Sequence, residues 1–118
     1  MQHLKSQEST THVSNDGTVT VKEFNFKGDA TLNDAVIVLS GRYPITGYAV
    51  NDVSTALASV EEGTGGMTIK DGSTVTLSAG DRLLIKPGEP YYFDVIDKLV
   101  IRYTATPAWT PDRARTIQ

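Results

Sequence analysis

From residue 18 onward, the chain consists of short segments in which apolar and polar residues alternate, with turn-favouring residues between them. Alternation with a period of two is the pattern of a β-strand with one buried face, and no stretch shows the longer period of an amphipathic helix. The pattern predicts about nine short strands separated by turns at roughly 8–12 residues, which is typical of β-sandwiches and β-barrels. The predicted strands cover residues 18–24, 35–39, 47–52, 55–61, 67–70, 73–77, 82–86, 91–95 and 99–103. The sequence therefore predicts an all-β fold.

The clearest local signal is a hairpin around Asp71-Gly72, which stands between two alternating runs. This dipeptide favours a two-residue type I′ turn, because glycine tolerates the positive φ that such a turn requires. A cluster of glycines precedes the hairpin, at Gly63, Gly65 and Gly66. Glycines so close together within a strand pattern predict a tight bend or a β-bulge.

The length of 118 residues suits a single domain. Residues 1–16 are rich in polar side chains, and we expect them to form a flexible N-terminal segment. The barrel is expected to span residues 17–106. Residues 107–118 are expected to form an extended tail that lies across the outside of the barrel or across a partner subunit.

Composition excludes several classes of function. The net charge of −3, without a cluster of Lys or Arg, gives no reason to expect nucleic acid binding. The chain has 0 cysteines, so disulfides, thiolate metal sites and cysteine nucleophiles are excluded. No apolar run approaches the roughly 20 residues of a membrane span, and the N-terminus lacks the apolar core of a signal peptide. We therefore expect no membrane partner, and a cytoplasmic location is the default expectation.

Residues 80–91 resemble the second sequence motif of the cupin superfamily. Gly80 and Gly88 match the two glycines of the motif, Pro87 lies one place after the usual proline, and Tyr91 stands where the family has a metal-binding histidine. Residues 41–51, the pair Tyr91-Tyr92 and residues 106–109 also resemble small single-domain bacterial cupins of the RmlC-like jelly-roll superfamily. The resemblance implies a cupin-type jelly-roll β-barrel, also called a double-stranded β-helix, and a homodimer.

The first cupin motif, which ends at Gly63, is degenerate. The slots for its histidines and glutamate, with the histidine slot of the second motif, fall on Ala49, Asn51, Ala56 and Tyr91, and a shorter spacing moves the two histidine slots to Val50 and Asp52. The two histidines of the chain, His3 and His12, lie in the polar N-terminal segment. A catalytic zinc or iron site needs about three converging ligands. The sequence therefore predicts a barrel without a metal and without another cofactor.

A barrel without bulky metal ligands is expected to enclose a pocket lined by alternate residues of its strands. The candidate lining residues are Ala49, Asn51, Ala56, Ala58 and Tyr91, with Tyr48, Asp52 and Arg82 as secondary candidates. For each polar candidate a structural role is the alternative. Tyr91 would then be a packed core tyrosine, and Tyr48 would lie in the core or in an interface. Asp52 would stabilise the turn at Ser54, and Arg82 would be solvated.

Three functions remain open from the sequence. The first is a metal-free barrel that binds a small organic molecule, with carbohydrate-like ligands among the candidates. The second is a metal-independent isomerase or lyase in which Tyr91 acts as acid or base. The third is a structural role in which the protein assembles as a homodimer, with Ile101, Tyr103 and Trp109 as candidate apolar interface residues.

Overall fold

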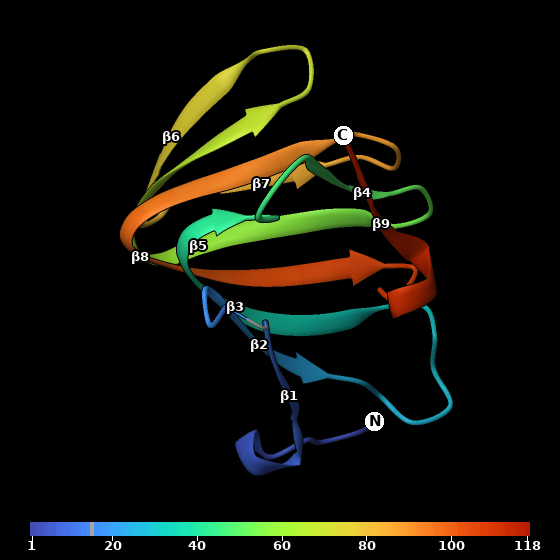
Figure 1. The fold of residues 1–118 in the computed structure, drawn as a ribbon. Helices are drawn as coiled ribbons and strands as arrows, with labels where there is room; N and C mark the ends of the chain where they lie inside the picture. The colour runs from blue at the N-terminus through green and yellow to red at the C-terminus, as the bar shows by residue number, and fades with distance from the viewer. Residues whose placement is uncertain (15) are drawn as a thin grey trace.

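A single antiparallel sheet that curls around its own inner face makes up most of the protein (Figure 1). The computed structural model describes residues 1–14 and 16–118. Within them, the strands are β1 (Thr10–Val13), β2 (Val19–Phe24), β3 (Asn33–Tyr43), β4 (Tyr48–Asn51), β5 (Thr55–Ile69), β6 (Thr74–Ser78), β7 (Arg82–Ile85), β8 (Tyr91–Thr106) and β9 (Ala114–Ile117). Two short 3₁₀ turns, η1 (Ser6–Glu8) and η2 (Pro111–Arg113), lie near the termini. The predicted all-β fold is confirmed.

Strand β8 is the centre of the sheet. It pairs with β3 along one edge and with β5 along the other, and β5 in turn pairs with β6 and β7. The two strands predicted at 91–95 and 99–103 are one continuous strand, and β5 likewise spans two predicted strands. The register of β5 against β8 shifts between Gly63 and Gly66, which confirms the predicted bulge. A bulge bends a strand without ending its pairing, and this is why the sheet can curl.

The hairpin turn between β5 and β6 differs from the predicted type. Gly72 has a φ of 99°, but no residue other than glycine among those described has a positive φ, so Asp71 cannot form a type I′ turn. Instead the Gly72 N–H donates to the carbonyl of Ile69 at 2.9 Å, and the Ser73 N–H donates to Oδ1 of Asp71 at 2.7 Å. The aspartate side chain thus fixes its own backbone at negative φ, and a three-residue loop replaces the two-residue turn.

The inner face of the sheet carries the hydrophobic core. Leu39, Leu99 and Ile101 are 1%, 0% and 1% exposed, and they lie side by side across β3, β8 and the neighbouring strands. Side chains two residues apart on each strand point to this face, as the alternation in the sequence predicts. The same buried cluster includes Met67 of β5 and Phe93 of β8.

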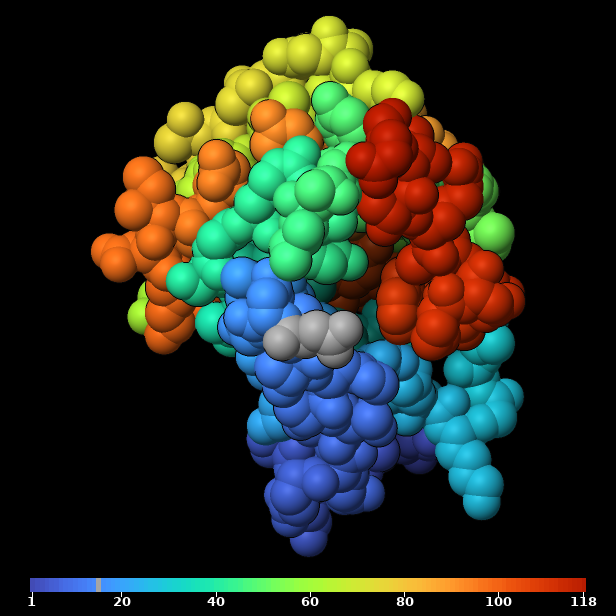
Figure 2. All heavy atoms as spheres, viewed as in Figure 1, coloured from blue at the N-terminus to red at the C-terminus, as the bar shows by residue number. Residues whose placement is uncertain are grey.

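Both terminal segments contribute to the sheet. Segment 1–16 was expected to be flexible, but its β1 pairs along its whole length with β2, while residue 15 lies outside the described residues. Tail 107–118 contains β9, which pairs with β4 at the sheet edge. Figure 2 shows one face of the molecule, with the C-terminal segment in red beside the N-terminal segment in blue. Among the described residues, no helix is long and apolar enough to span a bilayer.

Candidate functional site

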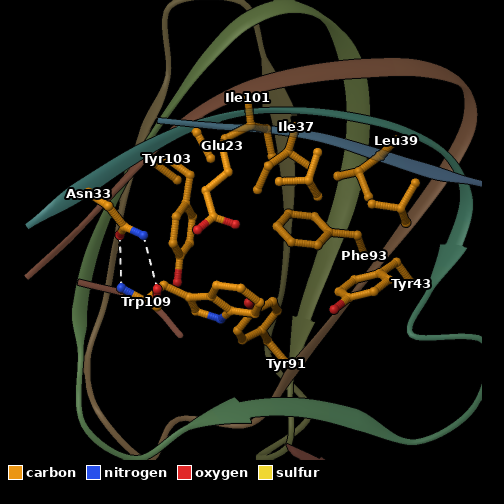
Figure 3. A pocket seen from close by; sticks show the side chains of 14 residues that line it. Glu23, Asn33, Ile37, Leu39, Tyr43, Tyr91, Phe93, Ile101, Tyr103 and Trp109 are labelled. Atoms are coloured by element: carbon orange, nitrogen blue, oxygen red, sulfur yellow. Dashed lines mark hydrogen bonds between the residues drawn. The ribbon is translucent and has the colours of Figure 1, made fainter. Parts of the chain in front are cut away.

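A cavity of about 100 Å³ lies against the inner face of β2, β3 and β8 (Figure 3). Its wall is formed by alternate residues of these strands, so it follows directly from the period of two. The lining residues are Val19, Val21 and Glu23 of β2, Asn33, Ala35, Ile37, Leu39 and Tyr43 of β3, Ala58 of β5, Tyr91, Phe93, Ile101 and Tyr103 of β8, and Trp109 of the tail. The wall is mostly apolar, and the polar groups gather toward the end formed by Asn33 and Glu23.

The register of the sheet places a carboxylate and a phenol on either side of an alanine. Glu23 pairs with Ala35, Ala35 pairs with Tyr103, and Tyr103 pairs with Ala58. Neighbouring strands lie about 4.8 Å apart, so the backbones of Glu23 and Tyr103 are separated by roughly 10 Å. The methyl groups of Ala35 and Ala58 leave open the space between and beside the two longer side chains.

Hydrogen bonds hold the polar end of the cavity. Asn33 is 3% exposed; its Nδ2 donates to the Trp109 carbonyl at 2.9 Å and its Oδ1 accepts the Trp109 N–H at 2.8 Å. Asn33 Nδ2 also donates to Oδ1 of Asn25 at 3.0 Å, and Asn25 Nδ2 donates to Oε1 of Glu23 at 2.7 Å. The other carboxylate oxygen of Glu23 lies 3.2 Å from Nε2 of His12. One chain of contacts therefore connects the C-terminal tail to β1 through the carboxylate.

The cavity keeps its tyrosines protonated. Burial raises the pKa of Tyr43 above its ordinary value of 10.0, and burial, with Tyr43 nearby, raises the pKa of Tyr103 to about 12. Burial raises the pKa of Tyr91 well above 10.0, and the neighbouring Tyr103 and Tyr43 raise it further. An apolar wall disfavours the phenolate, because its charge loses the solvation of water. At neutral pH these hydroxyls act as hydrogen-bond donors and acceptors and not as bases.

The raised pKa of Tyr103 predicts that the free energy of unfolding decreases at alkaline pH. The unfolded chain releases this proton near pH 10 and the folded chain near pH 12, so the stabilising effect is complete below pH 10 and is lost as pH rises toward 12. We expect the free energy of unfolding, measured by urea titration, to fall across this window by about 1.4 kcal/mol per pH unit on account of Tyr103. Tyr103→Phe is expected to show a shallower fall, and an unchanged slope would contradict this assignment.

The residues that were predicted to line the lumen lie in three different parts of the structure. Tyr91 and Ala58 line the cavity, and the rings of Tyr91 and Phe93 pack in a T-shaped arrangement with centroids 5.5 Å apart. Ala56 is 1% exposed in the core, in the row of side chains next to the cavity. Ala49 and Asn51 line a second cavity of about 120 Å³. The two cavities share Tyr43, Tyr91, Tyr103 and Trp109, so an aromatic layer separates them.

The amide of Asn51 has a structural task. Its Oδ1 accepts the backbone N–H groups of Val53 and Ser54, both at 2.9 Å, while Nδ2 has no hydrogen-bond partner among the described residues. Asn51 therefore performs the turn-stabilising role that the sequence suggested for Asp52. Asp52 instead accepts two hydrogen bonds from Arg115 of β9, at 2.7 and 3.2 Å. This contact lowers the pKa of Asp52 and clips the tail to the end of β4.

The remaining secondary candidates lie outside the cavity wall. Tyr48 packs against Tyr92 with ring centroids 5.6 Å apart, and Arg42 covers the Tyr92 ring at 4.1 Å. Tyr91 and Tyr92 therefore serve opposite faces of β8, as neighbours on a strand must. Arg82 is exposed and donates to the carbonyl of Gly80 at 2.6 Å.

The sequence interpretation missed the polar end of the cavity. Glu23 continues the face of Val19 and Val21 by a period of two, and Asn33 precedes Ala35 in the same way, so the alternation itself was the available signal. Ile101, Tyr103 and Trp109 were suggested as an external interface, and all of them line the cavity instead. The side chains of Ile101 and Tyr103 point inward from β8, and the tail brings Trp109 back against the same cavity. His12 of the polar N-terminal segment contacts Glu23, while its side chain remains 53% exposed.

The residues present do not fit the metal site of metal-binding cupins. Ala49 lies opposite Tyr91 in the register of β4 and β8, so two of the slots do come together, but neither side chain is a customary zinc or iron ligand. Within residues 1–14 and 16–118, no group of three His, Cys, Asp or Glu side chains converges on a point that could hold a metal ion.

Comparison with solved structures identifies the fold. A variant of Streptomyces PAC13 solved with uridine matches with a TM-score of 0.83 and 14% identity, over 100% of this chain and 92% of that one; Pac13 is described as a nucleoside dehydratase. The polyketide cyclase RemF from Streptomyces resistomycificus matches with a TM-score of 0.76 and 16% identity, over 100% and 86% of the two chains. Ectoine synthase from P. lautus matches with a TM-score of 0.76 and 11% identity, over 100% and 91%.

No protein-family model and no curated protein sequence matches this chain. Identities between 11% and 16% in the three structural matches establish the fold alone. These matches are cupin-fold proteins, and the chain has the same cupin-type jelly-roll fold. The cupin-type fold that the resemblance of residues 80–91 implies is thereby confirmed.

Proposed function

We propose that the protein binds a small, ring-shaped organic molecule in the cavity between β2, β3 and β8. The observation that carries this proposal is the row Glu23, Ala35, Tyr103 and Ala58, in which small residues leave a gap beside hydrogen-bonding groups. Cavities that are largely apolar with a few convergent polar groups are typical of small-molecule sites. The three structural matches described above are each named for action on a small organic molecule, which supports a small organic ligand here.

Size and polarity narrow the ligand class. A cavity of about 150 Å³ lined by aliphatic and aromatic side chains accommodates benzene. The cavity here, at about 100 Å³ and partly open, suits one ring with further groups extending through the mouth. The hydroxyls of a carbohydrate would each need a hydrogen-bond partner, and the wall of Val, Ile, Leu and Phe offers few. A flat ring with one or two polar groups therefore fits better than a carbohydrate-like ligand.

Filling the gap above Ala35 tests the proposal. Binding is followed by the fluorescence of Trp109, the 1 tryptophan of the chain, with phenol, cyclohexanone, uridine and glucose as probes. We expect single-ring probes to bind, and Ala35→Leu to raise their Kd at least about tenfold by occupying the gap. Ala79→Leu, at an exposed turn, is the matched control and is expected to leave Kd unchanged. If no probe changes the emission of the wild type, the proposal fails.

Catalysis with Tyr91 as a base is not favoured. Burial raises the pKa of Tyr91 well above 10.0, so the hydroxyl keeps its proton at neutral pH. Its use to a bound molecule is as a hydrogen-bond donor. An isomerase or lyase built on this cavity needs a different base.

A homodimer remains a proposal. Ile101, Tyr103 and Trp109 line the cavity, so a dimer would use another surface. Leu57 and Leu84 pair with each other on adjacent strands and are 49% and 60% exposed, which makes them the candidates on the outer face. Light scattering of the wild type and of Leu84→Lys decides between a dimer through this face and a monomer.

A further inference from the structure

Glu23 is an unusual residue for an apolar wall. It is 9% exposed, and the carboxylate points into the cavity with the ring of Tyr103 extending in the same direction (Figure 3). Withdrawing a carboxylate from water is strongly unfavourable unless hydrogen bonds replace the lost solvation. Asn25 supplies one such bond to Oε1 at 2.7 Å, and His12 contacts Oε2 at 3.2 Å.

These contacts come from the edge of the sheet and leave the cavity side of the carboxylate free. Asn25 is exposed, and the His12 side chain is 53% exposed on β1, the edge strand next to β2. On the cavity side the neighbours of Glu23 along β2 are Val21 and Val19, which offer no hydrogen bond. The arrangement fixes the carboxylate in place and directs its remaining lone pairs at whatever occupies the cavity.

A hydrogen-bond donor stands across the gap. The Tyr103 hydroxyl belongs to the same cross-strand row, with only the methyl of Ala35 between the two side chains. Tyr43 and Tyr91 also line the cavity, and a raised pKa keeps all three hydroxyls protonated at neutral pH. A carboxylate base opposite a protonated donor in an apolar pocket is an arrangement that enolises carbonyl compounds without a metal.

We propose that Glu23 is the general base of a metal-independent isomerase site for small cyclic ketones, with the Tyr103 hydroxyl donating to the carbonyl oxygen. This inference rests on the proposed binding function and names its substrate class. In an unsaturated ketone whose double bond is not conjugated, Glu23 accepts a proton from the carbon between the carbonyl and the double bond. The electron pair of that C–H bond forms a dienolate, whose oxygen accepts a hydrogen bond from Tyr103. Glu23 then returns the proton to the far end of the dienolate, and the conjugated ketone results with no change in composition.

The single ring of 3-cyclohexen-1-one provides the probe, and its conversion to 2-cyclohexen-1-one is followed by NMR. We expect the wild type to convert it at least about 100-fold faster than buffer, and Glu23→Gln to lose that acceleration. Tyr103→Phe is expected to lose about tenfold to hundredfold, because the dienolate oxygen loses a donor. Glu62→Gln is the matched control, since its carboxylate is exposed on β5 and pairs with Lys98 at 3.5 Å, outside the cavity lining.

Binding of the same probe, measured by Trp109 fluorescence, separates the two proposals. A wild type that binds the probe without converting it, or a Glu23→Gln variant that converts it at the wild-type rate, overturns the catalytic role and leaves the binding function standing. A wild type that binds neither this probe nor those used above overturns both. If Glu23→Gln does not fold, Glu23→Asp and Tyr103→Phe decide the matter, and conversion at the wild-type rate by both overturns the inference.

Discussion

Replacing Gly63 by alanine is expected to lower the free energy of unfolding by about 4 kcal/mol or more, enough to leave much of the protein unfolded. Gly63 has a φ of 84°, and a Cβ there would strike the backbone carbonyl oxygen of Lys98 and approach its carbon to 2.9 Å. Gly63 lies directly opposite Leu99, the side chain of which is 0% exposed. The clash is with backbone next to Leu99, which pairs with Gly63 on one side and with Leu39 on the other. No side-chain rotation relieves it, so β5 and β8 must move apart at this point.

Gly72→Ala provides the matched comparison for Gly63→Ala. Gly72 also has a positive φ, 99°, but a Cβ there meets nothing within 4 Å. Its substitution is expected to cost only the left-handed backbone strain of about 1–2 kcal/mol. Urea unfolding followed by circular dichroism measures both variants. Equal losses for the two would show that strain alone matters and that the close approach of β5 to β8 has been misjudged.

Asn33→Ala is expected to lower the free energy of unfolding by about 2–4 kcal/mol, because the N–H and C=O of Trp109 lose their partner at once. Three hydrogen bonds end on this one amide, at 2.8, 2.9 and 3.0 Å. The loss also reaches the cavity, since Trp109 forms part of its wall. We expect the midpoint of thermal unfolding to fall by on the order of 10 °C and the Trp109 emission to shift to the red as the indole gains contact with water.

The control for Asn33→Ala is Asn25→Ala. Asn25 belongs to the same hydrogen-bonded chain, but it is exposed, and its hydrogen bonds go to Glu23 and Asn33 and not to Trp109. Its substitution is expected to cost about 1 kcal/mol or less and to leave the emission unchanged. A red shift as large as that of Asn33→Ala would contradict the role assigned to Asn33, because the tail would then be held by the network as a whole.

Much of the site follows from local pattern once the strands are known. Val19 and Val21 lie on the inner face of β2, and Glu23 follows at the same period of two. The alternation therefore predicts that Glu23 is buried, as the structure shows. The candidate lining residues were instead predicted from the metal-ligand positions of the cupin motifs, which do not include β2. Of those, Tyr91 lines the cavity between β2, β3 and β8, whereas Asn51 serves a turn beside the second cavity.

The C-terminal tail shows the opposite case. Nothing local to Trp109 indicates that it turns inward, since Pro107 and Pro111 beside it read equally well as an extended external segment. Its position depends on Asn33, 76 residues earlier in the chain. A hydrogen bond between residues so far apart leaves no periodic pattern in the sequence. The apolar character of Trp109 therefore suggested an interface residue, whereas in the structure Trp109 is part of the cavity wall.

The sequence by itself determined that the chain is all-β, that a tight bend or a bulge falls at Gly63 to Gly66, and that alternate residues face one interior. These properties depend on neighbours within a few residues, through turn chemistry and a side-chain period of two. Only the tertiary structure decided that Glu23, Ala35 and Tyr103 stand in one row and that Trp109 closes the space beside them. Register between strands distant in the chain is set by the packing of the whole inner face, and shifting it by one residue would direct every one of these side chains outward.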